Sequence, residues 1–335
     1  MCVYARNKNG HTEIITVWVD DLILFGDTTE VVEALESEIS KLFETTKLGE
    51  PTKIVGIEVT RNRKKGTLTI TQEKYIENLL VSYELEKANS VSTPMDLSVD
   101  LTPTETGNGD RSNAYASLVG SLMYLAVATR PDIAYAVNKL ATYTANPEMK
   151  HWSAAKRVLR YLKGTMQAGI TYKKGKSDAE MFYGYSDASF ASESDGKSIS
   201  GHVFMSGNGP IVWGARKQRM VVLSTTEAEY VALSEAAREA AWLRNLYEEL
   251  GHTQTAPTLI RGDNQGSMAI AENPQFHKRT KHFSVKVHYI REQINEKVVQ
   301  VEYCPTSEMV ADIMTKPLAR ARHVQHSESL GMTLA

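Results

Sequence analysis

The sequence is poor in several features that define common protein classes. Its 335 residues include only two cysteines, Cys2 and Cys304, which excludes a disulfide scaffold and a cysteine-rich zinc module. Lys and Arg total 38 against 40 Asp and Glu, so the net charge of −2 excludes a uniformly basic nucleic-acid binder. The longest mostly apolar run, residues 118–128, is too short to span a bilayer. The first ten residues lack the apolar stretch of a secretory signal, so we expect an intracellular protein, cytoplasmic or nuclear, without a membrane partner.

The composition that remains is typical of folded domains. Hydrophobic residues make up 42% and charged residues 23%, which predicts a sizeable core. At roughly 150 residues per domain, the length favours two or three domains. A stretch rich in Ser, Thr, Pro and Gly over residues 89–112 and a Lys-Gly-Lys-Ser stretch at 174–177 are candidate linkers. We therefore expect three units, at residues 1–88, 89–177 and 178–335.

The first two units read as an α+β segment followed by a helical one. Apolar, β-rich runs flank Asp20 and Asp21 over residues 14–25, which predicts a hairpin with this acidic pair at its tip. A helix over residues 28–46 follows, with Thr28 or Thr29 as its N-cap. A second hairpin is expected at 54–60 and 67–71, and a short helix at 73–83. Residues 113–165 are predicted to be helical, with interruptions at Pro131 and Pro147.

From residue 180 the hydrophobic period changes to that of strands. Strands are expected at 181–187, 199–205 and 211–215, then a long helix at 224–250. A strand at 258–263, a helix at 266–271, a strand at 298–303 and a short helix at 309–318 complete the unit. The order βββαβαβα predicts a mixed α/β sheet.

Four acids fall where such a fold gathers its chemistry. Asp187 and Asp263 close two of the expected strands, and functional groups collect beyond the carboxyl ends of strands in open α/β sheets. Asp312 lies in the last short helix. Taken singly, each acid is better explained as an ordinary residue at a strand end or helix start, and only their common placement favours a site.

The long helix offers Glu227 and Glu229 as a further acid. Glu229 lies three residues before Ala232 on the apolar stripe that faces the sheet. Glu227 follows Ser224 by three residues, which is the spacing of a capping box, and it falls on the solvent side with Ser234. We therefore expect Glu229 to join the site and Glu227 to cap the helix.

Converging carboxylates repel one another, and divalent cations relieve that repulsion. Hard oxygen ligands suit Mg²⁺ or Mn²⁺, and two such ions about 4 Å apart are the usual device for phosphodiester hydrolysis. The four acids therefore predict a site for two divalent ions.

The segments that carry these acids resemble the ribonuclease H domain of copia-type LTR retrotransposon Pol polyproteins. They are Gly-Tyr-Ser-Asp-Ala-Ser-Phe-Ala at 184–191, Leu-Ser-Thr-Thr-Glu-Ala-Glu-Tyr-Val-Ala-Leu at 223–233, Gly-Asp-Asn-Gln-Gly-Ser-Met-Ala at 262–269 and Val-Ala-Asp-Ile-Met-Thr-Lys-Pro-Leu at 310–318. Upstream, Trp-Val-Asp-Asp at 18–21 is similar to the metal-binding hairpin of a reverse transcriptase palm. Residues 115–123, 129–133 and 160–165 are similar to the connection between the two enzymes.

The resemblance implies a fold and an activity. It implies a ribonuclease H-like mixed sheet, preceded by a truncated reverse transcriptase palm and a helical connection. It implies that Asp187, Glu229, Asp263 and Asp312 hold two Mg²⁺ or Mn²⁺ ions and hydrolyse the RNA strand of an RNA–DNA hybrid. The rest of a polyprotein is a further implied partner.

The resemblance also indicates that the reverse transcriptase palm is incomplete in this sequence. Only 19 residues precede Asp20, so we expect Asp20 and Asp21 to be a vestigial metal site, and we expect no DNA synthesis by this chain alone. Many ribonuclease H domains add a histidine near the last carboxylate; His277, His282 and His288 are the candidates here, and the sequence does not choose among them.

Basic residues gather in two places despite the net charge of −2. Residues 150–163 form a cationic amphipathic helix in which Lys156, Arg157, Arg160 and Lys163 can face phosphates. A second cluster contains Lys278 and Arg279. Each has a plain alternative as a solvated helix face or loop.

Two other functions compete with the nuclease. One is a catalytically idle nucleic-acid-binding relic of a retrotransposon polyprotein, and the other is a cellular protein that uses the fold for protein contacts. The presence of all four acids favours the nuclease over the relic, and the basic helix disfavours the third hypothesis.

Overall fold

The computed structural model describes residues 2–104, 112–174, 181–272 and 284–334. Twelve strands in this part of the chain form three sheets, ordered β1-β2-β3, β4-β5-β6-β7 and β10-β9-β8-β11-β12. The strands are β1 (Cys2–Lys8), β2 (His11–Trp18), β3 (Asp21–Gly26), β4 (Lys53–Ile54), β5 (Ile57–Asn62), β6 (Thr67–Thr71), β7 (Ile170–Lys173), β8 (Tyr183–Ser189), β9 (Ile199–Ser206), β10 (Gly209–Lys217), β11 (Thr258–Gly262) and β12 (Val299–Tyr303). The α-helices are α1 (Thr29–Ser40), α2 (Glu73–Ser82), α3 (Ser112–Ala128), α4 (Ala134–Ala141), α5 (Met149–Gly164), α6 (Thr225–Glu249), α7 (Gln265–Glu272), α8 (Ser284–Asn295), α9 (Asp312–Thr315) and α10 (Arg320–Ser329).

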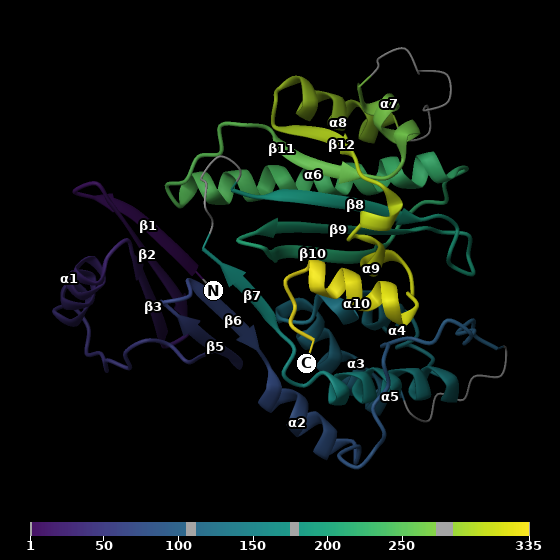
Figure 1. The fold of residues 1–335 in the computed structure, drawn as a ribbon, viewed down its shortest axis with the longest axis horizontal. Helices are drawn as coiled ribbons and strands as arrows, with labels where there is room; N and C mark the ends of the chain where they lie inside the picture. Colours follow the sequence, from purple (N-terminus) through teal and green to yellow (C-terminus); the bar gives the residue numbers. More distant parts are fainter. Residues whose placement is uncertain (1, 105–111, 175–180, 273–283, 335) are drawn as a thin grey trace.

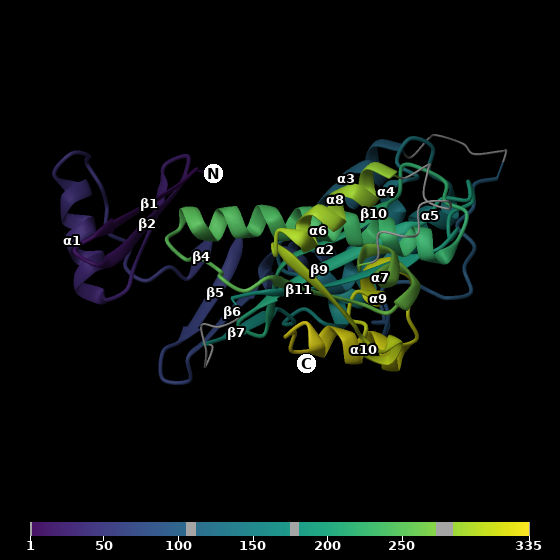
Figure 2. The ribbon, with the colours of Figure 1, turned by 90° about the horizontal axis from the view of Figure 1, so that it is seen from above.

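The first sheet contains the predicted acidic hairpin. Strands β2 and β3 pair antiparallel as far as Trp18 opposite Asp21, which leaves Val19 and Asp20 as the turn, with Val19 at a φ of 52°. Thr28 caps α1 as predicted, accepting from the Val31 backbone N–H at 3.4 Å. Strand β1 was not predicted, because its seven residues are exposed throughout and carry no alternation of polar and apolar side chains. This sheet and α1 lie at one end of the molecule (Figure 1, Figure 2).

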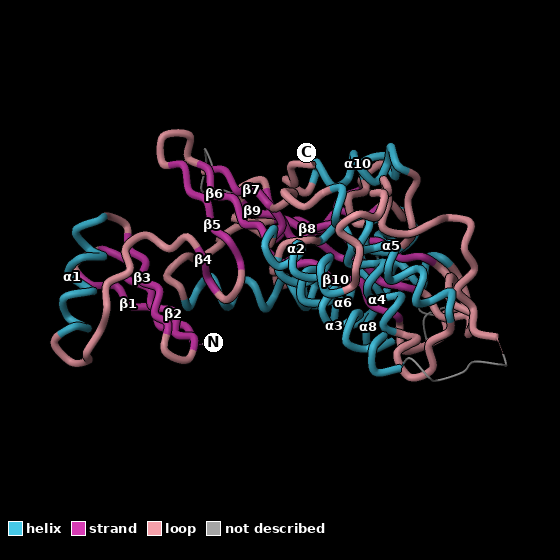
Figure 3. The backbone as a smooth tube through the Cα atoms, turned by 90° about the horizontal axis from the view of Figure 1, so that it is seen from below, coloured by secondary structure: helices cyan, strands magenta, loops and turns pink. Residues whose placement is uncertain are grey.

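The second sheet joins segments from either side of the expected boundary at residue 88. The predicted hairpin of β5 and β6 turns at Gly66, whose φ is +62°. Strand β7 then pairs antiparallel with β6 from a position about 100 residues further along the chain (Figure 3). Gly169 permits this pairing, since a Cβ there would lie 2.2 Å from the Ile70 carbonyl oxygen. The sequence did not predict β7, which has only four residues.

Helices α2 to α5 form the middle of the molecule. The predicted interruptions are confirmed: Pro131 starts a short 3₁₀ turn between α3 and α4, and Pro147 precedes α5. One hydrophobic core joins α2 to the three later helices, so the loop at residues 89–104 connects helices that pack together. Its most deeply buried members include Ile76, Tyr115, Leu122, Val137, Leu140, Val158 and Leu162.

A buried ion pair ties the segments at 129–133 and 160–165 to each other. Arg130 donates to both carboxylate oxygens of Asp132, at 3.0 and 2.7 Å, and both side chains are fully buried. Tyr161 donates its hydroxyl to the same carboxylate at 2.7 Å, and Arg130 also reaches the Thr165 hydroxyl and carbonyl. These residues therefore have a structural role in which each buried charge has partners.

The five-stranded sheet has the predicted mixed topology. Strands β8, β9 and β10 form an antiparallel meander, and β11 and β12 add parallel to β8. The long helix α6 covers one face with α8, and α9 covers the other (Figure 1). Helices α8 and α10 were not predicted. Because α7 and α8 pack on a second side of α6, Ser234 is buried, and its expected place on the solvent side was wrong.

The end of the described chain packs back on the middle of the molecule. Met332 forms a β-bridge with Ile170, and the Thr171 backbone N–H donates to the Gly331 carbonyl at 3.0 Å. Leu330 and Met332 share a core with Ala168, Val203 and the α9 residue Met314. His323 of α10 also bonds the Asp132 carbonyl at 3.1 Å. Among the described helices, none is long and apolar enough to cross a membrane.

Candidate metal centre

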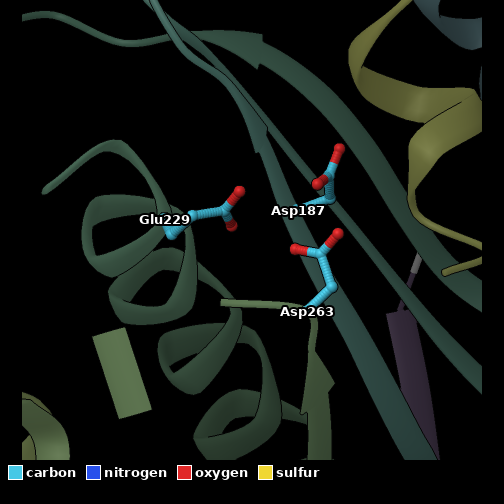
Figure 4. Close-up of side chains that lie close together, drawn as sticks. All are labelled: Asp187, Glu229 and Asp263. Carbon is cyan, nitrogen blue, oxygen red and sulfur yellow. The ribbon is translucent and has the colours of Figure 1, made fainter. Parts of the chain in front are cut away.

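Three of the predicted acids meet at one edge of the five-stranded sheet. Asp187, Glu229 and Asp263 each place one carboxylate oxygen within 4.8 Å of the others. Figure 4 shows Glu229 reaching from its helix toward the two aspartates, which come from neighbouring strands. Side chains from three distant parts of the sequence therefore form one compact group of oxygen atoms.

The local structure explains each position. Asp187 lies near the end of β8, and Asp263 directly follows β11, which pairs parallel with β8, so both strands deliver their acid at the same edge. Glu229 lies in the second turn of α6, on the face toward the sheet. Glu227 caps the helix as predicted: its backbone N–H donates to Ser224 Oγ, and its carboxylate accepts from the Leu223 N–H at 2.7 Å.

Burial and mutual repulsion make this group a poor place for unneutralised charge. Asp187 is 2% exposed, and Glu229 and Asp263 are half-buried. Burial, and then the charges of Asp312 and Asp263, raise the pKa of Asp187. Burial, followed by the charges of Asp187 and Asp263, raises the pKa of Glu229 well above its usual range.

The donor set fits a hard divalent cation. Three carboxylates in reach of one point offer oxygen ligands, which Mg²⁺ and Mn²⁺ prefer over nitrogen or sulfur. A cation there would also offset the repulsion that raises both pKa values. The residues present therefore suit a divalent ion held by Asp187, Glu229 and Asp263.

Asp312 lies beside this group but is not one of the three. It is the first residue of α9 and is fully buried, and each of its oxygens faces a cation. Lys316 Nζ lies 2.7 Å from Oδ1, and an Arg322 guanidinium nitrogen lies 3.2 Å from Oδ2. The role of Asp312 as a fourth ion ligand stays a prediction.

The remaining candidate ligands lie elsewhere. Asp20 and Asp21 are exposed at the hairpin tip, and in the part of the chain that the structure describes they join no group of three metal-ligating side chains. His288 is exposed on α8. His277 and His282 lie outside the described residues, as do Lys278 and Arg279.

The predicted basic helix, α5, uses most of its cations within the protein. Arg157 bonds Thr93 at 3.1 Å and pairs with Asp96 at 3.3 Å. Arg160 and Lys163 donate to the carbonyls of residues 89 and 88, each at 2.7 Å. Lys156 instead lies over the Trp152 ring, 5.6 Å from its centre. Three of the four side chains expected to meet phosphates thus hold the loop before α3.

Sequence reasoning missed the polar residues that surround the acids. Thr315 donates its hydroxyl to Asp187, and Thr306 donates to Asp263 at 2.8 Å. The ion pair of Lys316 with Asp312 has a sequence signal, the four-residue spacing of helical partners. No comparable signal marks Arg322, which comes from another helix.

Similar known proteins cover nearly the whole length of this chain. Residues 1–97 match the family model for reverse transcriptase (RNA-dependent DNA polymerase). The chain is 37% identical over 340 residues to the retrovirus-related Pol polyprotein from transposon TNT 1-94 of Nicotiana tabacum, a match that covers 99% of this chain. It is 30% identical to the putative transposon Ty5-1 protein YCL074W of Saccharomyces cerevisiae, covering 71% of this chain and 77% of that protein.

The match to the plant polyprotein spans 25% of that protein's length. Among solved structures, the foamy viral protease-reverse transcriptase in complex with an RNA/DNA hybrid aligns with 87% of this chain and 36% of its own, at 12% identity and a TM-score of 0.49. Because the plant polyprotein matches 99% of this chain, and the match to the yeast protein covers 77% of that protein at 30% identity, the chain belongs to the copia-type Pol family of retrotransposons.

Proposed function

We propose that this chain is a metal-dependent nuclease of the ribonuclease H type, which hydrolyses the RNA strand of RNA–DNA hybrids with two Mg²⁺ or Mn²⁺ ions. The observation that carries the proposal is the meeting of Asp187, Glu229 and Asp263 within 4.8 Å, on a ribonuclease H-like sheet of a Pol-family chain. Asp312 is proposed as the acid that completes the set for the second ion.

The chain's own residues would hold the ions and fix their place. Asp187 and Asp263 are delivered by paired parallel strands, and Glu229 closes the group from α6. Divalent ions held there would supply an activated water and would stabilise the charge on the leaving oxygen. Thr315 and Thr306 donate hydroxyls to Asp187 and Asp263, which orients these carboxylates, as partners of metal ligands commonly do.

The proposed substrate is recognised by shape and charge. Hybrid discrimination rests on groove geometry and on contacts to ribose 2′-hydroxyls rather than on base edges. Lys156 and the pair Lys278 and Arg279 are the proposed phosphate contacts, since Arg157, Arg160 and Lys163 are already paired within the protein. Such contacts give affinity that falls with salt.

Cleavage of an end-labelled RNA–DNA hybrid by the full chain in Mg²⁺ tests the proposal. We expect cuts in the RNA strand only, with duplex DNA left intact, and loss of at least about a hundredfold in rate for Asp187→Asn, the scale seen when one key electrostatic group is removed. Glu227→Gln is the matched control: it makes the same acid-to-amide change two residues from Glu229, and glutamine still suits a capping box.

Two results would count against the proposal. Equal cleavage by the wild type and Asp187→Asn would mean that the site is wrongly assigned. The wild type could instead fail to cleave the hybrid and still bind it with an affinity that falls steeply with salt. In that case, the idle nucleic-acid-binding relic becomes the better description.

A further inference from the structure

Lys316 lies between Asp312 and the three grouped acids. Its ammonium nitrogen is 2.7 Å from Asp312 Oδ1 and 3.9 Å from Asp187 Oδ2. Lys316 therefore places an ammonium cation beside Asp187 and Asp312, two of the residues that would hold the proposed ions.

The charges at this edge leave room for one divalent ion. With all four acids ionised, as the ligands of a cation are, the two cations that contact Asp187 or Asp312 among the described residues, Lys316 and Arg322, leave two negative charges. One divalent ion balances that remainder. A second ion beside Lys316 would add two positive charges next to an existing one, which is unfavourable in a partly buried site.

We propose that Lys316 acts as a built-in cation that holds the position between Asp187 and Asp312, so that the protein without nucleic acid binds one divalent ion tightly. Asp187 and Asp312 could hold a second ion only after the Lys316 side chain withdraws. This inference rests on the proposed function and adds to it an order of ion binding, with Lys316 as a positioning residue.

The surroundings of Lys316 allow that withdrawal. It follows the last residue of α9 in an extended conformation, and its side chain is 35% exposed on an unbranched stem. Arg322 stays on the other oxygen of Asp312 and keeps this buried carboxylate paired when the lysine leaves. A phosphodiester of the substrate is an anion that can take the released ammonium as its partner, so substrate binding would favour loading of the second ion.

The test is a titration of the full chain with Mn²⁺ in the absence of nucleic acid, with free Mn²⁺ followed by electron paramagnetic resonance. We expect one tight ion for the wild type. For Lys316→Gln we expect affinity for the second ion to rise by at least about tenfold, because a unit charge has been removed from a partly buried site. Lys316→Arg keeps the charge and should keep one tight ion.

Arg322→Gln is the matched control, because it removes one positive charge from the other oxygen of Asp312 without a contact to Asp187. We expect it to change the second-ion affinity less than Lys316→Gln does; an equal rise would overturn the assigned position of Lys316. A wild type that binds two ions equally tightly, or a Gln variant that titrates like the wild type, would overturn the inference and leave the proposed nuclease standing. No Mn²⁺ bound by the wild type would overturn both.

Discussion

Replacing Asp187 with asparagine should stabilise the metal-free protein. Asp187 is buried, and its pKa rises from 3.8 to about 6 because of burial and then, after an opposing effect of Lys316, the like charges of Asp312 and Asp263. Each pKa unit corresponds to about 1.4 kcal/mol, so the ionised carboxylate costs the folded state about 3 kcal/mol at pH 8. Asparagine has nearly the same shape, and its Oδ1 can still accept the Thr315 hydroxyl bond.

The sign of the pH dependence follows from the raised pKa. The folded protein holds this proton more tightly than the unfolded chain, so the stabilising contribution is full below about pH 4 and is lost as pH rises through about 6. In urea titrations with EDTA, the wild type should lose stability over that window and Asp187→Asn should lose about 3 kcal/mol less. At pH 8, the variant should unfold at higher urea.

Added Mg²⁺ should reverse the order, because a bound ion stabilises only the protein that holds it. The wild type should gain stability with Mg²⁺ concentration at pH 8, and Asp187→Asn should gain much less. A variant that is less stable than the wild type in EDTA would refute the reasoning, since it would show that Asp187 stabilises the fold without an ion.

Three further predictions concern stability. Arg130→Met leaves the carboxylate of Asp132 buried without its main partner and should cost about 3–5 kcal/mol in urea unfolding, whereas an exposed-pair substitution such as Lys74→Met should cost under about 1 kcal/mol. Ser224→Ala removes the N-cap of α6 and should cost about 1 kcal/mol while Mn²⁺ binding is retained; loss of binding would mean that the cap also positions the acids. Leu330→Ala opens a cavity in the core shared with the connection and should cost about 2–5 kcal/mol in a single unfolding transition; two separate transitions would contradict that shared core.

The sequence predicted best where a pattern is local. The hairpin tip at Asp20 needs only two apolar runs, and the Thr28 cap needs only its neighbours. The choice of Glu229 over Glu227 follows from helical periodicity and a capping-box spacing, and the structure places Glu229 with the other acids and Glu227 on the cap.

What the sequence could not predict depends on partners distant in the chain. Strand β7 has four residues and is specified by its pairing with β6. The sequence predicted that the cations of α5 bind phosphates, because positive charge can be recognised in a sequence. The backbone carbonyls that accept from Arg160 and Lys163 cannot be recognised there, since they come from a different segment. The position of Lys316 near Asp187 likewise arises only when β8 and α9 meet.

The β-bridge between Ile170 and Met332 joins the end of the described chain to strand β7. The chain after α10 returns to the strand that follows α5, so the sheet bearing the acids and the helices before it share one core and cannot swing apart without breaking it. Under the proposed nuclease function, a duplex held at one fixed point on those helices would therefore place a phosphate at a constant distance from that point beside the acids. The length of nucleic acid between that point and the proposed cut would then be the same in each reaction.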